Sequence, residues 1–418
     1  MNRLLSIVIL CGCAGSLVDH AAFNAGGTPE CLQSCTSTPV QGADPICIGS
    51  TCTYQCRGGK LKCAAGCCDV DALSAGTSHT CAVVAGEARC WGANDKGQLG
   101  QAGILKSYSP VQPSGITGTV TAIAAGWTHT CAVANGAVAN GEVWCWGDDT
   151  DGQLGDRPSG AGSFSSTPRK ISSLTEVQKI ATGGGHTCAA TATQLFCWGR
   201  NDSGQIGDGT SSGPRVVPTA VSGVSGPVAA VALGESHTCA LTSSGVSCWG
   251  ANDKGQLGNG TVAPSSTPVA SLNSASFLGL GAKHSCAGSS SSGKLSCWGA
   301  NAQFQVDNTG QDQPLPREVL SNAGAVVGGF GHTCAVTTSQ DMKCWGLNDQ
   351  GQIGAPPGSG HEEDVTIPGV WQAAAAGYKH TCALQNKGAF CWGSNDQGQL
   401  GTNLGGQVSS APVAVSGR

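Results

Sequence analysis

Short apolar runs separated by polar turn residues recur along most of the chain. Runs at 120–125, 130–134 and 142–146 are examples, and the residues between them are rich in Gly, Asn and Ser. Runs of this length bounded by turn residues are typical of β-strands, and no segment shows the sustained spacing of a helix. The pattern therefore predicts an all-β protein.

The sequence also contains a longer repeat, which includes several of these runs. A His-Thr/Ser-Cys motif followed by Cys-Trp-Gly occurs seven times, and most copies continue into Asn-Asp-x-Gly-Gln-Leu/Ile-Gly. The second copy reads Asp148 to Gly155 instead, and the fifth has degenerated, with Phe304 in place of a turn glycine. The motif histidines are His79, His129, His186, His237, His284, His332 and His380. The tryptophans are Trp91, Trp146, Trp198, Trp249, Trp298, Trp345 and Trp392.

Each repeat also contains a proline-led apolar run, which predicts a fourth strand. Proline lacks the amide donor that a central strand needs, so these strands should lie at the outer edges of their sheets. Four strands repeated seven times at roughly 50 residues each predict a seven-bladed β-propeller over 71–418. The prolines are Pro110, Pro168, Pro218, Pro268, Pro316, Pro368 and Pro412.

The count of strands also predicts how the ring closes. The first unit has no proline-led strand before it, whereas the last such strand, 411–415, follows the seventh Cys-Trp-Gly. We therefore expect strand 411–415 to complete the first blade, and expect deletion of 408–418 to open the ring.

A cysteine-rich module precedes the repeats, over 30–70. Few large apolar residues occur there, so the module should depend on disulfides rather than on a core. Eight cysteines allow 105 pairings, and the sequence does not choose among them. No pair has the C-x-x-C spacing of a zinc or redox site, which leaves metal binding as a weaker alternative. The cysteines are Cys31, Cys35, Cys47, Cys52, Cys56, Cys63, Cys67 and Cys68.

The first residues have the features of an export signal. A basic start at Arg3 is followed by an apolar run over 4–10 and then by small residues, which predicts a signal peptide over 1–12. Leu10-Cys11-Gly12-Cys13 resembles the lipobox of bacterial lipoproteins, and this resemblance implies a lipid attached at Cys13 and a tether over 13–29. The alternative is a plain secretory signal cleaved near Ala14-Gly15.

Composition and charge narrow the class of protein. Twenty-four cysteines in 418 residues indicate an oxidising compartment, and thus an exported protein. With 39% hydrophobic residues the chain can form a core, which argues against disorder. The net charge is −5 and no basic run exceeds a dipeptide, so we expect no nucleic-acid partner.

Paired cysteines in each repeat predict one disulfide per blade. One cysteine follows each motif histidine and another precedes each tryptophan. A two-residue turn at Ser243-Ser244 places Cys239 opposite Cys248 on adjacent strands, within reach of a disulfide. Removing Cys11 and lipidating Cys13 leaves an even number of thiols. The predicted pairs are Cys81 and Cys90, Cys131 and Cys145, Cys188 and Cys197, Cys239 and Cys248, Cys286 and Cys297, Cys334 and Cys344, and Cys382 and Cys391.

The repeat His-Thr-Cys-Ala-Val/Leu, then Cys-Trp-Gly-x-Asn-Asp-x-Gly-Gln-Leu-Gly, resembles that of the regulator of chromosome condensation family. The resemblance covers about 71–418 and implies a seven-bladed propeller. The family's namesake is a nuclear nucleotide-exchange factor for the Ran GTPase that also binds nucleosomes, and a bacterial relative is an exported inhibitor of β-lactamases. This chain differs from the namesake in its signal sequence, paired cysteines and lack of basic tails.

Catalytic motifs are missing from the sequence. It contains no Gly-x-Ser-x-Gly, His-Glu-x-x-His or P-loop, so we expect no enzyme and no cofactor. The repeated histidines should bond to neighbouring turns, and the tryptophans should pack between blades. Calcium at Asp148, Asp149 and Asp151 is a weaker hypothesis than an ordinary turn, because the EF-hand spacing is missing.

Breaks in the repeat are the candidate partner-binding sites. They are the longer second hairpin with Trp144, the altered turn at Phe304, and an acidic loop in the sixth unit. That loop contains His361, Glu362, Glu363 and Asp364.

We hypothesise a non-enzymatic, surface-anchored scaffold that binds a protein or another surface ligand. It should be monomeric, exported to the outer membrane or cell surface or otherwise secreted, and held at the membrane only by its lipid. The alternatives are an exported enzyme inhibitor and, ranked last, a guanine-nucleotide exchange factor.

Overall fold

The computed structural model describes residues 40–48, 51–136, 140–156, 164–358, 361–402 and 405–416. The chain forms two compact units, residues 1–55 and 56–418. The first contains β1 (Ala43–Ile48) and most of β2 (Thr51–Cys56), which pair as a two-stranded sheet. The predicted signal peptide, tether and lipid site at Cys13 lie outside the described residues.

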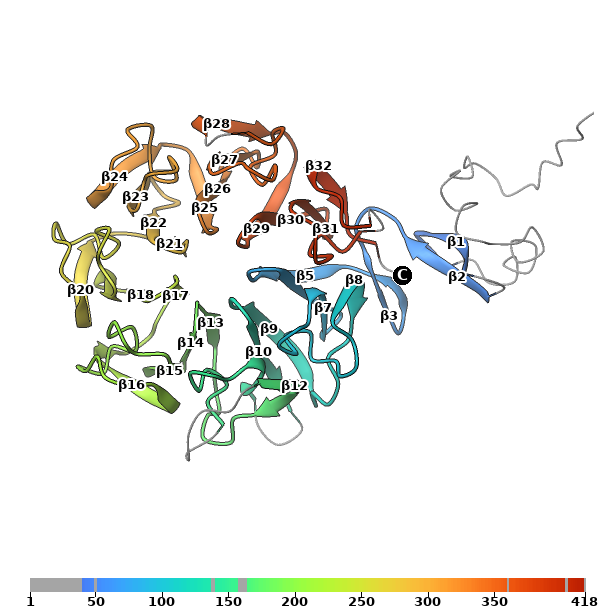
Figure 1. Cartoon of the computed structure of the whole chain (residues 1–418), viewed down its shortest axis with the longest axis horizontal. Coiled ribbons are helices and arrows are strands. Elements are labelled where there is room, and N and C mark those ends of the chain that lie inside the picture. Colours follow the sequence, from blue (N-terminus) through green and yellow to red (C-terminus); the bar gives the residue numbers. More distant parts are fainter. Residues whose placement is uncertain are drawn as a thin grey trace, which may run out of the picture. The chain divides into compact units, whose positions relative to one another are not determined.

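The second unit is a ring of seven four-stranded antiparallel sheets, as the repeats predict (Figure 1). The innermost strands are β5 (Val70–Ala75), β9 (Thr119–Ala125), β13 (Lys179–Thr182), β17 (Ala230–Leu233), β21 (Phe277–Leu280), β25 (Ala323–Gly328) and β29 (Trp371–Ala376). The second strands are β6 (His79–Val84), β10 (His129–Asn135), β14 (His186–Ala190), β18 (His237–Thr242), β22 (His284–Gly288), β26 (His332–Thr337) and β30 (His380–Gln385). The third strands are β7 (Glu87–Ala93), β11 (Glu142–Asp148), β15 (Gln194–Gly199), β19 (Gly245–Gly250), β23 (Leu295–Gly299), β27 (Met342–Gly346) and β31 (Gly388–Gly393). The outer strands are β8 (Lys106–Val111), β12 (Phe164–Lys170), β16 (Arg215–Ser225), β20 (Ser265–Leu272), β24 (Gln313–Leu320), β28 (His361–Ile367) and β32 (Ser409–Ala414).

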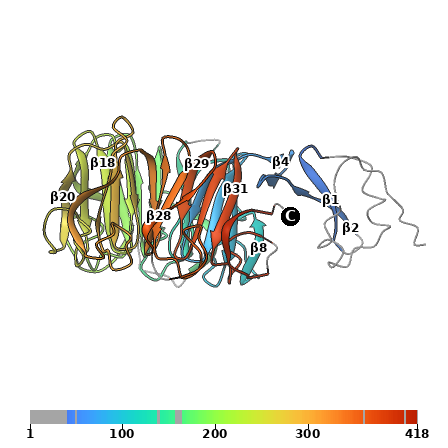
Figure 2. The same cartoon turned by 90° about the horizontal axis from the view of Figure 1, so that it is seen from above.

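The apolar core is divided among the interfaces between blades. Between the second and third blades, for example, Val133, Leu154 and Ile171 of one blade pack with Trp198 of the next. The second strand of a blade is covered on both faces, and all six residues of β6 are buried. Figure 2 shows the sheets standing side by side in this way. This two-sided burial is the reason that the second strands do not alternate between polar and apolar residues.

Outer strands carry the prolines, as expected for strands with only one neighbour. Six of the seven prolines lie within these strands, and Pro368 directly follows β28. The pairing of third and outer strands shifts register in every blade, for example between Cys90 and Gly92. A proline fits at such an edge, since its missing amide hydrogen breaks no central ladder.

The expected closure by the C-terminal strand is wrong. Strand β32 pairs with β31 in the seventh blade, and the first blade is completed by its own β8. Each proline-led strand belongs with the Cys-Trp-Gly strand before it, to which the Asn-Asp turn connects it, and not with the following unit. The first and seventh blades meet as other neighbours do, through side-chain contacts such as Trp91 Nε1 donating to the Gln399 carbonyl.

Residues 56–70 belong to the propeller unit, so the boundary of the cysteine-rich module expected at residue 70 differs from the structure. The hairpin of β3 (Leu61–Cys63) and β4 (Gly66–Cys68) is fastened by two disulfides, Cys56–Cys67 and Cys63–Cys68. Cys31 and Cys35, and the side chains of Cys47 and Cys52, are outside the description.

This hairpin is joined to the seventh blade. Ala389 N donates to the Gly59 carbonyl at 2.9 Å, and Val70 N donates to the Lys387 carbonyl at 2.8 Å. Leu61 is fully buried, in a cluster that includes Trp91 of the first blade and Leu400 of the seventh. The segment preceding the first blade therefore covers the seam between the first and last blades.

We predict that Leu61→Ala lowers the free energy of unfolding by about 2–5 kcal/mol, because it leaves a cavity at the seam. Equilibrium unfolding in guanidinium chloride with the disulfides intact measures this loss. The control is Leu315→Ala on β24, where the side chain is 58% exposed and the effect should stay within about 0.5 kcal/mol. Equal effects of the two substitutions would show that Leu61 does not support the ring.

Candidate functional site

All seven predicted cysteine pairs are joined as disulfides, each between the second and third strands of one blade. The strand register places the two cysteines directly opposite, as with Cys81 and Cys90, whose Cα atoms are 4.1 Å apart. The half-cystines are at most 1% exposed. The bonds therefore fix individual blades, and none of them joins one blade to the next.

A closed belt of side-chain hydrogen bonds connects the blades. The Nε2 atom of each motif histidine lies 2.9 Å from the hydroxyl oxygen of the motif Thr or Ser in the next blade. The pairs are His79 with Thr130, His129 with Thr187, His186 with Thr238, His237 with Ser285, His284 with Thr333, His332 with Thr381, and His380 with Thr80. The histidines thus bond to a neighbouring strand rather than to the neighbouring turn that the sequence led us to expect.

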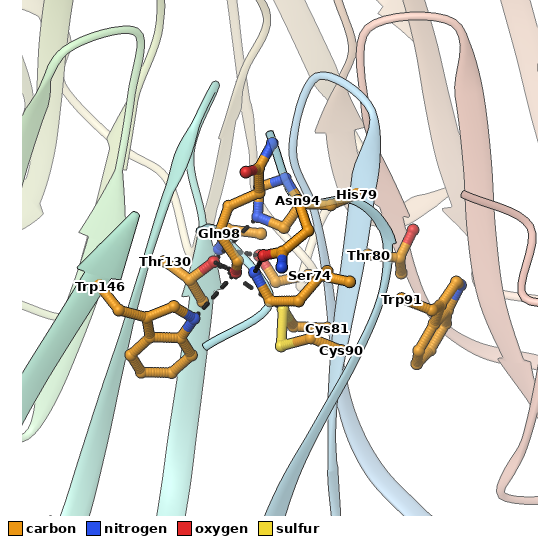
Figure 3. Close-up of a disulfide and its surroundings, with 12 residues drawn as sticks. Ser74, His79, Thr80, Cys81, Cys90, Trp91, Asn94, Gln98, Thr130 and Trp146 are labelled. Carbon is orange, nitrogen blue, oxygen red and sulfur yellow. Dashed lines mark hydrogen bonds between the residues drawn. A yellow bond between two sulfur atoms is a disulfide. The ribbon is translucent and has the colours of Figure 1, made fainter. Parts of the chain in front are cut away.

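Each hydroxyl of the belt also donates a hydrogen bond. Thr130 Oγ1 donates to the Gln98 carbonyl of the first blade at 2.9 Å, and Trp146 Nε1 donates to the same oxygen at 2.8 Å (Figure 3). Because the hydroxyl proton is used in this way, Oγ1 accepts its bond from His79, whose Nε2 must carry the proton. One carbonyl, one hydroxyl, one indole and one imidazole therefore form a repeated junction between blades.

Burial keeps the belt imidazoles neutral. All seven are 0% exposed, and desolvation lowers the pKa of His79 to about 3 and that of His380 to about 4. Their Nδ1 atoms have no hydrogen-bond partner among the described residues. A glycine three positions before each histidine lies against the ring: a Cβ on Gly76 would come within 2.7 Å of His79 Nδ1. Such imidazoles cannot reach a substrate.

The Asn-Asp-x-Gly-Gln segment is a turn that positions the shared carbonyl. Asn94 Oδ1 accepts from Leu99 N at 2.8 Å, and Gln98 Oε1 accepts from Lys96 N at 2.9 Å. Gly97 has φ of 75°, a conformation that favours glycine. The turn places the Gln98 carbonyl toward the next blade.

One face of the ring carries these turns and the shorter turns between first and second strands; we call it the turn face. A central channel of about 300 Å³ opens between the innermost strands. At the first position after the conserved glycine, the seven short turns have Thr77, Trp127, Gly184, Glu235, Ala282, Phe330 and Tyr378. The rings of Phe330 and Tyr378 stack at 4.0 Å, and both, like Trp127, line the channel.

A second hollow of about 350 Å³ lies beside the channel at the fourth blade. Its lining includes Asp202, Glu235, Asp253 and Lys283. Lys283 pairs with Asp253 at 3.3 Å, and Asp202 pairs with Arg200 at 2.6 Å. Glu235 makes no ion pair with any residue in the described ranges.

The partner-binding residues expected from the sequence do not come together. Trp144 lies within β11, opposite Ala132, and packs against the core between the first two blades. Phe304 occupies a turn of the fifth blade with φ of 61°. The segment 361–364, expected to be a loop, begins the outer strand β28 instead, where Asp364 pairs with Lys343 at 2.5 Å.

Sequence reasoning did not find Trp127, Glu235, Phe330 and Tyr378. The available signal was variation at the two positions between the repeated glycine and the histidine of each turn. It also assigned no role to the motif threonines, which the structure places at the centre of each junction.

Comparison with known proteins identifies matching families over most of the ring. The model of the RCC1-like domain matches residues 58–322, and that of the regulator of chromosome condensation (RCC1) repeat matches 325–352 and 371–399. Ultraviolet-B receptor UVR8 of Arabidopsis thaliana is 31% identical over 299 residues, covering 68% of this chain and 66% of the receptor. Probable E3 ubiquitin-protein ligase HERC4 of Homo sapiens is 31% identical over 218 residues, 49% of this chain and 21% of the ligase. The chain thus spans less than two thirds of the length of either relative.

Solved structures show the same fold. Human WBSCR16 superposes with a TM-score of 0.66 at 21% identity, covering 78% of this chain and 93% of that one. Yeast RCC1 (Prp20), solved bound to Kap60, gives a TM-score of 0.68 at 19% identity, covering 86% and 85%. At these identities the likeness concerns the fold alone.

We predict that Thr187→Val costs about 1–3 kcal/mol of stability, because it leaves the buried His129 donor without an acceptor. Thr187→Ser keeps the hydroxyl, which the fifth blade already uses at Ser285, and should cost less than about 1 kcal/mol. Equilibrium unfolding of both variants in guanidinium chloride checks the difference. If the serine variant is as unstable as the valine variant, packing of the methyl group and not the hydrogen bond holds the junction.

We also predict that stability falls as the pH is lowered from about 7 to 5. The folded ring holds its histidines neutral with pKa values of about 3 to 4, whereas in the unfolded chain they protonate below about 6.5. Each can remove up to about 1.4 kcal/mol per pH unit over this window. Calorimetry at constant ionic strength measures the change, and a melting temperature that stays constant between pH 7 and 5 would contradict it.

Proposed function

Because the chain belongs to the family of RCC1-like propellers, we propose that it is an exported, non-enzymatic scaffold that binds a protein or another surface ligand through one face of the ring. The main observation behind this proposal is that the polar side chains repeated in every blade form the hydrogen bonds between blades. The His, Thr and Trp of each repeat are buried and bonded across a blade junction. The exposed residues of the turns are not used in this way, and they differ from blade to blade.

Propeller faces suit binding better than catalysis when the residues at them differ from blade to blade. A ring presents loops from seven blades side by side, so that many small contacts can add up on one partner. In the described ranges, no group of three His, Cys, Asp or Glu side chains is arranged to hold a metal ion. The non-enzymatic role that we propose rests on the repeated histidines, which are neutral and inaccessible.

The disulfides indicate an oxidising compartment. Seven buried bonds between strands of one blade would be lost, or would never form, where thiols are kept reduced. Within the described part of the chain, no helix is long and apolar enough to cross a bilayer. We propose attachment through a lipid on Cys13, which rests on the sequence at 10–13.

Two other functions remain as hypotheses. An exported inhibitor would use the same kind of face to block an enzyme, and would show as stoichiometric loss of that enzyme's activity. Nucleotide exchange requires contact with a cytosolic GTPase, which the oxidising compartment disfavours, and the likeness to yeast RCC1 extends only to the fold.

The first test is the intact mass of the protein from its native membrane fraction, with and without reduction, after alkylation of free thiols in denaturant. We expect a chain that starts at an acylated Cys13 and gains no alkyl groups until it is reduced. Of the 24 cysteines, all except the removed Cys11 and the lipidated Cys13 should then be alkylated. An unprocessed chain with freely alkylated thiols would disprove export, and acceleration of GDP release would become the decisive assay.

The binding role itself is tested by cross-linking on intact cells, followed by mass spectrometry. A scaffold should give reproducible cross-links from one face to the same partner. Absence of any cross-linked partner under conditions in which the protein is abundant would contradict the scaffold proposal.

A further inference from the structure

The seven short turns of the turn face differ at the two positions that lie between a repeated glycine and the motif histidine. Each reads Gly-x-x-His, with the glycine against the imidazole and the histidine in the belt. The first variable position is Gly184 in one blade and Ala282 in another, so the fold needs no large side chain there. The ring therefore does not require an aromatic or charged residue at this position, although Phe330 and Tyr378 also contact each other between the sixth and seventh blades.

Aromatic residues occupy the position in the sixth, seventh and second blades. Phe330, Tyr378 and Trp127 are each partly exposed, and all three line the channel. Only Thr77 of the first blade lies between them in blade order, so the three rings form an arc over adjoining blades; we call it the aromatic arc. The motif tryptophans, by contrast, are buried at the junctions.

Glu235, the one charged residue of the seven, lies in the fourth blade. In Figure 1 this blade, with β17, is across the ring from β29 and β5, which lead into the turns of Tyr378 and Thr77. The carboxylate is half-buried and lines the hollow beside the channel. The other two carboxylates of the hollow, those of Asp202 and Asp253, are in ion pairs, whereas Glu235 interacts with a cation, Arg200, only beyond ion-pair distance among the described residues.

The hollow and the channel share one lining residue. Ala282 lines both, and its carbonyl accepts a hydrogen bond from Glu235 N at 2.9 Å. An extended bound segment can therefore run from the Glu235 carboxylate past Ala282 and across the channel toward the aromatic arc. A half-buried carboxylate attracts a cation, and aromatic faces bind both cations and apolar groups.

We propose that the turn face binds a partner protein through a segment in which an Arg or Lys side chain enters the hollow at Glu235 and an apolar side chain several residues away packs on the aromatic arc across the channel. The inference rests on the proposed function, and it adds the chemistry of the partner and the face used. A second copy of the chain is a different occupant, which would show as self-association.

The probe is a random dodecapeptide library displayed on phage, selected against the full chain with its disulfides intact. We expect enriched peptides to carry Arg or Lys and, several residues away, an aromatic or aliphatic residue. Synthetic copies of these peptides should bind about tenfold more weakly to Glu235→Gln and to Trp127→Ala, as measured by titration calorimetry. Binding should also weaken with added salt.

Matched controls separate the site from general effects of charge and aromatic loss. Glu318→Gln removes a carboxylate on β24 that pairs with Lys294, and Phe164→Ala removes a 47% exposed ring on β12. Neither should change peptide affinity. Unchanged melting temperatures for all four variants would establish that any loss of binding is local.

Peptides that lack a cation, or whose affinity survives both site substitutions, overturn the inference while leaving the scaffold proposal intact. Failure to enrich any peptide also overturns it. Loss of wild-type self-association in Glu235→Gln, measured by sedimentation, would identify a second copy as the occupant and overturn it as well. If the peptides bind as expected but intact cells give no cross-linked partner, the peptide site on the turn face is supported and the proposed scaffold function at the cell surface is contradicted.

Discussion

The junction at which one glutamine carbonyl receives both a hydroxyl and an indole from the next blade is the interaction on which the ring depends. The Gln153 carbonyl accepts from Thr187 Oγ1 and Trp198 Nε1, while Thr187 in turn accepts from His129. Each participant is buried, so leaving any one of them unbonded would cost free energy that water could not restore. This explains why His, Thr or Ser, Trp and Gln recur together in every repeat.

Disulfides and hydrogen bonds stabilise different parts of the molecule. Disulfides lie within blades, between the second and third strands, whereas hydrogen bonds and apolar contacts join blade to blade. The covalent links therefore restrict each hairpin in the unfolded chain but do nothing to keep neighbouring blades together. That task falls to the junctions and, at the seam, to Leu61 and the hairpin before the first blade.

Much of this architecture was predictable because it repeats. Seven copies of two motifs predicted the blade count, the strand count and the cysteine pairs, since each inference was checked by six others. The bonding partner of the motif histidines was mistaken in all seven blades, but other errors came from features that occur once. The β3–β4 hairpin holds a single buried leucine, the segment 361–364 has a polar sequence yet pairs as an edge strand, and the closing strand was assigned to the wrong neighbour. The turn-face residues were missed because they vary, and a search for repeated residues passes over positions that differ.

The belt of imidazoles and hydroxyls has no terminal member. Every Nε2 donates in the same rotational sense, from one blade to the one after it, and the bond from His380 to Thr80 is equivalent to the other six. A linear array of the same blades, whatever its length, would always leave one donor and one acceptor without a hydrogen bond at its ends. Shared bonding of this kind favours a ring over a stack, so an ancestral gain or loss of a repeat would be tolerated only where the remaining blades could curve enough to meet again.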